Sequence, residues 1–146
     1  MRKSLYLLLT GFIFCLGIML VGCKTMAATD EETVLMLVNE ERVSNGLEPL
    51  SIDSDLQKAA QVRANEASVS YSHQRPDGSA FYTVSNKANG ENLAKAYKCN
   101  TLNEVVDSWM LSEGHKKNIL WKTSTVTGIG VCKLADGTYY VAELFN

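Results

Sequence analysis

The sequence lacks several motifs that would have identified its chemistry directly. It contains neither the H-E-x-x-H zinc motif of metalloproteases nor the G-x-S-x-G turn that carries a serine nucleophile, so neither geometry is supported. No C-x-x-C pair occurs, which removes the usual signal for a thiol redox centre or a zinc ribbon. The formal net charge is −2 and no polybasic tract is present, so nucleic acid is excluded as an expected partner.

The N-terminus is typical of an export signal rather than of a folded domain. The basic residues Arg2 and Lys3 precede an apolar run over residues 5–21. This run is close to the length of a membrane span, so an uncleaved anchor is an open alternative. We therefore expect a signal peptide at 1–23, a short linker at 24–32 and one domain at 33–146.

The end of this leader offers two cleavage sites. Leu20-Val21-Gly22-Cys23 resembles a bacterial lipobox, in which the peptidase cuts before a cysteine that carries a diacylglyceryl group. The small-residue pattern Met26-Ala27-Ala28 would instead release a soluble protein. We favour lipidation of Cys23, because it directly follows glycine at the end of the apolar run. The prediction is an extracellular or cell-surface protein that meets the membrane only through its N-terminal lipid or signal anchor.

The cysteine count is consistent with export. Of four cysteines, Cys15 lies in the apolar run and Cys23 ends it, which leaves Cys99 and Cys132. An even pair in an oxidising compartment predicts one disulfide, with two free thiols as the alternative. Closing a loop of this size would stabilise the fold by about 3–4 kcal/mol in the chain-entropy model.

The hydrophobic pattern predicts helices first and a β-hairpin last. Helix starts are indicated by candidate capping boxes, in which a threonine or serine is followed three residues later by glutamate or glutamine: Thr29 with Glu32, Ser54 with Gln57, and Thr101 with Glu104. β-branched and aromatic segments at 125–132 and 139–145 flank Asp136-Gly137, a strong hairpin signal. This order favours an α+β layer fold over repeated βαβ units.

Two histidines lie where predicted helices end. The helix through Trp109 stops at Ser112-Glu113-Gly114 and presents His115, while His73 directly precedes the turn signal Pro76-Asp77-Gly78. Each is either a site residue or an ordinary surface histidine. Glu91, in Gly90-Glu91-Asn92, is either a solvated loop charge or a carboxylate that points inward, and spacing does not decide between them.

Together these segments resemble a known family. The motifs occur in the order His73-x-Arg75-Pro76-Asp77-Gly78, Gly90-Glu91-Asn92-Leu93-Ala94, Trp109-Met110-x-Ser112-x-Gly114-His115-x-x-Asn118-Ile119-Leu120, Gly128-Ile129-Gly130-Val131 and Thr138-Tyr139-Tyr140. They resemble the bacterial branch of the CAP superfamily, which contains the cysteine-rich secretory proteins, antigen 5 and the pathogenesis-related class 1 proteins. The resemblance covers about residues 33–146. It implies a three-layer α-β-α sandwich with a central antiparallel sheet, and a cleft lined by two histidines and two acidic residues.

The cleft residues carry over by motif to His73, His115 and Glu91. In eukaryotic relatives the fourth member is a glutamate three residues after the helix tryptophan, and here that position is Ser112. Glu113 follows it and is the candidate replacement. A second departure is Glu143, where bacterial relatives often have glutamine.

Two imidazoles and a carboxylate suit a divalent cation such as Zn²⁺, so His73, His115 and Glu91 are candidate metal ligands. The same groups without metal would form a hydrogen-bonded network that titrates near neutral pH. We expect a surface-associated binding module for a lipid, peptide or cell-wall component. The alternatives are a metal-assisted hydrolase of peptide or envelope polymer, and a purely structural envelope lipoprotein.

Overall fold

The computed structural model of the protein describes residues 27–98 and 100–146. The predicted signal peptide, the predicted lipidation site Cys23 and Cys99, one half of the predicted disulfide, lie outside these residues. Cys132 makes no disulfide with any described residue. Within the described ranges, no helix has both the length and the apolar character that a membrane span requires.

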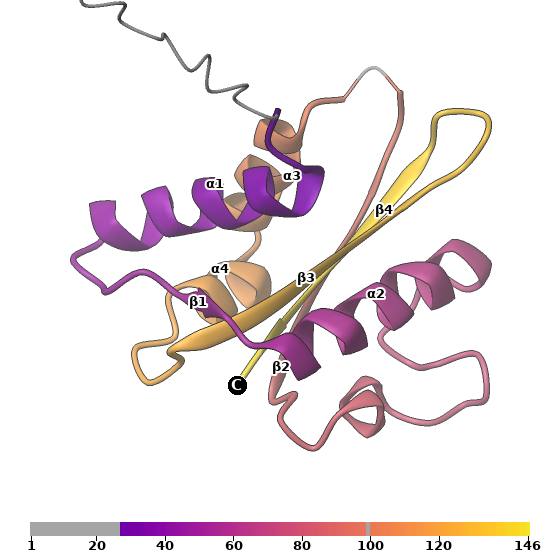
Figure 1. The fold of residues 1–146 in the computed structure, drawn as a ribbon, viewed down its shortest axis with the longest axis horizontal. Coiled ribbons are helices and arrows are strands. Elements are labelled where there is room, and N and C mark those ends of the chain that lie inside the picture. Colours follow the sequence, from indigo (N-terminus) through magenta and orange to yellow (C-terminus); the bar gives the residue numbers. More distant parts are fainter. Residues whose placement is uncertain (1–26, 99) are drawn as a thin grey trace, which may run out of the picture.

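The chain folds into three layers around a four-stranded sheet of order β1-β3-β4-β2. β2 (Gly90–Ala96), β3 (Val126–Lys133) and β4 (Tyr139–Phe145) pair antiparallel, and β1 (Ser51–Ile52) adds two residues parallel to β3. Helices α1 (Asp30–Ser44), α3 (Leu102–Leu111) and α4 (Glu113–Ile119) cover one face, whereas α2 (Ser54–Val69) and the 3₁₀ turn η1 (Phe81–Val84) cover the other (Figure 1). The predicted α+β sandwich and C-terminal hairpin are confirmed, with a sheet that is mixed only through β1.

The helix starts follow the local chemistry of their caps. Thr29 and Thr101 both form complete capping boxes, as predicted. The predicted box at Ser54 is wrong, because the side chain of Asp53 caps α2 instead and accepts from the amides of Asp55 and Leu56. Gln57 is thereby free for another role, in hydrogen bonds with the backbone of β3.

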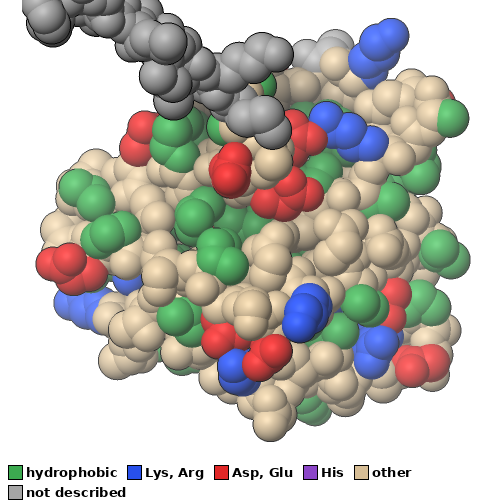
Figure 2. All heavy atoms as spheres, viewed as in Figure 1, with side chains coloured by type: hydrophobic (Ala, Val, Ile, Leu, Met, Phe, Trp, Pro, Cys, Tyr) green, Lys and Arg blue, Asp and Glu red, His purple; other side chains and the backbone are tan. Residues whose placement is uncertain are grey.

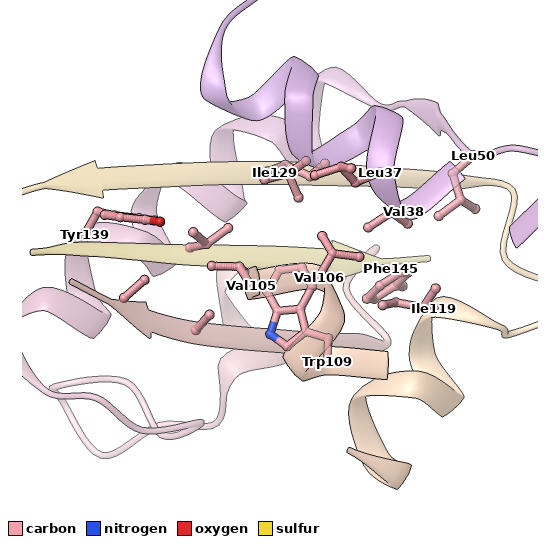
Figure 3. Packing of buried hydrophobic residues seen from close by; sticks show 14 residues of the cluster. Leu37, Val38, Leu50, Val105, Val106, Trp109, Ile119, Ile129, Tyr139 and Phe145 are labelled. Carbon is pink, nitrogen blue, oxygen red and sulfur yellow. The ribbon is translucent and has the colours of Figure 1, made fainter. Parts of the chain in front are cut away.

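Trp109 anchors α3 to the sheet. It is almost fully buried in the core between α1, α3 and the sheet, together with Val105 and Val106 from its own helix (Figure 3). Its indole Nε1 donates a hydrogen bond to the carbonyl of Leu93 on β2, at 3.1 Å. Burying so large a side chain fixes the end of α3 beside the outer edge of β2.

Two elements differ from the sequence prediction. Residues 90–96, for which no strand was predicted, form the edge strand β2. The helix break after Trp109 does not use Gly114, which lies inside α4. It occurs at Ser112, whose extended backbone (φ −92°, ψ 122°) ends α3 and begins α4. His115 is therefore held on a second helix rather than on a loop.

Candidate functional site

Three segments far apart in the sequence bring their polar residues together at the outer edge of β2. His73 lies in the loop after α2, Glu91 is the second residue of β2, and His115 is on α4. His73 Nδ1 lies 2.8 Å from Glu91 Oε1, and the two imidazole ring centroids are 6.4 Å apart. Because β2 is the last strand of the sheet, side chains from both helical layers meet around it.

Glu91 is buried and its charge is compensated by Arg63 of α2. Arg63 Nε donates to Glu91 Oε2 at 2.6 Å, and Nη2 lies 3.3 Å from Oε1. The side chains of both residues are completely inaccessible to solvent. Burial alone lowers the pKa of Arg63, but its hydrogen bonds to Glu91 and Glu66 outweigh that effect and raise the pKa overall. Arg63 was not among the site residues predicted from the sequence; the signal for it was an arginine on the otherwise alanine-rich buried face of α2.

The loop that carries His73 is fixed by a second ion pair. Arg75, from the R-P-D-G turn, donates from Nη2 to Glu66 Oε1 at 2.7 Å, and Glu66 also accepts from Arg63. Gly78 takes the positive φ of 85° that the turn signal predicted. Arg63 Nη2 further donates to the carbonyl of Ser72, directly before His73. The backbone of His73 is thus tied to α2 on both sides.

The hydrogen bond to Glu91 determines which tautomer His73 adopts when neutral. An ionised carboxylate only accepts hydrogen bonds, so Nδ1 of His73 carries the proton and donates it. The other nitrogen, Nε2, is then an unprotonated acceptor on the far side of the ring. The His73 side chain is 57% exposed, so this nitrogen is within reach of a ligand.

His115 lies in a drier environment. Its ring packs edge-on against Trp109, with 6.5 Å between ring centroids, and its backbone carbonyl accepts from Asn92 Nδ2 at 3.2 Å. Burial lowers the pKa of His115 below its usual value, and the proximity of His73 lowers it further. At neutral pH both effects favour the uncharged imidazole.

The fourth predicted member, Glu113, is not brought into this cluster. It is exposed in the first turn of α4, and its side chain makes no hydrogen bond or ion pair with the residues that the structure describes. The cluster therefore contains two imidazoles, one carboxylate and Arg63 rather than two carboxylates.

A cleft of about 260 Å³ opens between the histidines, lined by Tyr71, Ser72, His73, Leu93 and His115. Tyr71 donates from its hydroxyl to the carbonyl of Leu93 at 3.2 Å, so the rim is attached to β2. The face of the molecule drawn in Figure 2 shows no histidine side chain.

The predicted zinc ligands do not fit a metal centre in this arrangement. Both oxygens of Glu91 are engaged, by Arg63 and by His73, which leaves two imidazoles as the available donors. Protein zinc centres use at least three protein ligands. Among the residues that the structure describes, no group of three or more His, Cys, Asp or Glu is placed to hold a metal ion. Glu91 instead orients His73.

An α-β-α sandwich with this histidine pair at its sheet edge is the architecture that the sequence motifs implied. The model of the CAP family, described as the cysteine-rich secretory protein family, matches residues 35–145, and the chain belongs to that family. Over 108 residues it is 43% identical to YkwD, an uncharacterized protein of Bacillus subtilis. That match covers 68% of this chain and 41% of YkwD, so the chain spans about two fifths of that relative's length.

Solved structures share the fold. An outer surface protein of Borrelia burgdorferi is similar with a TM-score of 0.66 and 23% identity, over 80% of this chain and 90% of that one. An extracellular SCP-domain protein of Bacillus anthracis is similar with a TM-score of 0.63 and 20% identity, over 80% of this chain and 40% of that one. The NaASP2 protein, solved with Zn²⁺, is similar with a TM-score of 0.60 and 15% identity, over 82% of this chain and 80% of that one. The sequence match to YkwD places the chain beside a bacterial member of the family, and the solved structures share its fold.

Proposed function

We propose that this chain is an exported, surface-associated binding module and that the cleft between His73 and His115 is its recognition site. The observation that carries the proposal is the full engagement of the Glu91 carboxylate by Arg63 and His73. Removing the charges of Arg63 and Glu91 from water is unfavourable. The resulting ion pair holds the His73 imidazole in a fixed orientation beside an open cleft. Glu91 is then a positioning residue, and the imidazoles are the groups that meet the ligand.

The small size of the cleft and the imidazole acceptor at its edge favour a peptide or a polar cell-wall group over a lipid chain. Its volume of about 260 Å³ lies below the roughly 300–1,000 Å³ of sites that enclose a whole small molecule, so it suits one residue-sized group of a longer ligand. Neutral His73 offers an acceptor at Nε2, and Tyr71 and Ser72 add polar atoms. We therefore favour a peptide or a polar cell-wall component that presents N–H or O–H donors.

The metal-assisted hydrolase is the weaker alternative. To bind a metal, the Glu91 carboxylate would have to break its ion pair with Arg63, and the buried guanidinium would then lose that charge partner. No serine or cysteine side chain of the described residues hydrogen-bonds to either imidazole, so a nucleophile with an adjacent base is also lacking.

The test is a titration of the domain with soluble cell-wall peptide fragments and, separately, with lipid vesicles, followed through the imidazole resonances. We expect the fragments to shift both rings, and we expect His73→Ala and His115→Ala to abolish binding. Lys116→Ala, an exposed neighbour on α4, is the matched control and should bind normally. Unchanged binding in the double histidine variant would refute the site. Turnover of a peptide without stable binding would favour the hydrolase, and no interaction with either set would favour a structural role.

Export and anchoring are part of the same proposal. They rest on the basic and apolar leader, on the lipobox ending at Cys23, and on bacterial structures of the same fold described as outer surface or extracellular proteins. Cells grown with labelled palmitate should incorporate the label into the wild-type chain and not into Cys23→Ala. Equal labelling, or release of the wild type into the medium, would refute the lipid anchor.

A further inference from the structure

The outer edge of β3 is completed by glutamine side chains instead of a full strand. β1 pairs only with the start of β3. There the backbone amides of Ser51 and Asp53 donate to the carbonyls of Thr125 and Thr127. Further along, the amide of Ile129 donates to Gln57 Oε1 at 3.0 Å, and Gln57 Nε2 donates back to the Ile129 carbonyl. Gln61 repeats this pattern with Val131, at 3.4 and 3.0 Å.

The spacing of helix and strand makes this double cap possible. Positions i and i+4 of a helix are about 6 Å apart along its axis, and positions i and i+2 of a strand about 6.7 Å. Gly128 and Gly130 allow the helix to approach, since a Cβ there would lie 2.1 Å from Leu56 and 2.3 Å from Ala60, in both cases from backbone atoms. The backbone of α2 therefore lies against β3, and its two glutamines reach around the strand edge.

A carboxamide is suited to this position because it carries both an N–H donor and a C=O acceptor, as a peptide group does. An uncovered strand edge presents a row of the same groups and is a template for pairing with another chain. We propose that Gln57 and Gln61 form a side-chain strand that keeps β3 from pairing with β3 of a second copy of this chain.

The partner follows from the symmetry of the edge. An antiparallel pair of β3 strands related by a two-fold axis at Gly130 would place Ile129 of each copy opposite Val131 of the other. Such a pair forms four backbone hydrogen bonds, whereas two separate copies together hold eight bonds to their glutamines. The wild-type edge thus favours the monomer over the dimer. Without the Gln57 and Gln61 side chains, the β3-paired dimer has more hydrogen bonds than two separate copies and is favoured. β1 shows that this edge accepts a strand.

The test is the solution mass of Gln57→Ala/Gln61→Ala, measured by light scattering over roughly 10–500 µM. We expect a dimer at the upper concentrations, where the wild type remains a monomer. Lys58→Ala/Val62→Ala changes two exposed positions of the same helix and should stay monomeric. Adding Val131→Pro to the glutamine variant removes an amide that faces the edge rather than β4, and should restore the monomer.

A folded, monomeric Gln57→Ala/Gln61→Ala variant would overturn the proposal. Association that persists with Val131→Pro would also overturn it, because the contact would then not be the β3 edge. If the double variant does not fold, amide exchange in the wild type decides instead. The amides of Ile129 and Val131 should exchange as slowly as those of paired strands, and rapid exchange would show that the caps do not close the edge.

Discussion

Glu143 gives the sharpest quantitative prediction. Its side chain is completely buried in the central strand β4, where Oε1 lies 3.3 Å from the hydroxyl of Thr127 and Oε2 has no partner among the described residues. Burial raises the pKa of Glu143 to about 8, against the opposing effects of Thr127 and of the positive charge of Arg42. The guanidinium of Arg42 itself donates hydrogen bonds to backbone carbonyls, including those of Ile119 and Ser124.

The sign of the pH dependence follows from the two pKa values. The carboxyl group titrates near 4.5 in the unfolded chain and near 8 in the folded one, so the folded state retains its proton to higher pH. The contribution of Glu143 to the free energy of unfolding is therefore complete below pH 4.5 and is lost as the pH rises toward 8. Each pH unit in this window costs about 1.4 kcal/mol, which amounts to roughly 3 kcal/mol at pH 7.

Urea denaturation of the wild type and Glu143→Gln between pH 4.5 and 8 measures this effect. Glutamine keeps the shape and stays neutral, so the two proteins should have similar stability at pH 4.5, and the variant should be more stable by about 3 kcal/mol at pH 7. Glu40→Gln, at an exposed position of α1, should follow the wild type throughout. A difference that does not grow with pH would refute the assignment of a buried, protonated carboxyl.

Three further predictions concern the site and its supports. Arg63→Ala leaves the Glu91 charge buried and unpaired, and should lower the free energy of unfolding by about 3–5 kcal/mol in urea melts; a loss below 1 kcal/mol would contradict the pair. Gly130→Ala forces α2 away from β3 and should cost at least about 1–3 kcal/mol in the same assay, whereas a neutral result would contradict the close approach. The pKa of His115, followed by NMR, should lie below 6.5 and rise in His73→Ala, because the neighbouring charge is removed; no rise would mean that the rings do not interact.

The helices and the hairpin could be predicted from the sequence because each has a local signal, whereas the pairing of the two histidines followed only from the family resemblance. Capping boxes mark α1 and α3, and Asp136-Gly137 marks the turn before β4. β2 has no such signal: nearly all of it is buried, so polar and apolar residues do not alternate, and Glu91 interrupts the apolar run. The role of Arg63 depends on a partner 28 residues away, which only the packing of α2 on the sheet brings near.

The direct test of the account is the state of the His73 ring, read from its ¹⁵N resonances before and after addition of one equivalent of Zn²⁺. We expect a proton on Nδ1, a free Nε2, and no stoichiometric binding of the metal, because Glu91 is held by Arg63. A proton on Nε2, or tight uptake of Zn²⁺ that is lost in Glu91→Gln, would contradict the assignment of Glu91 as a positioning residue.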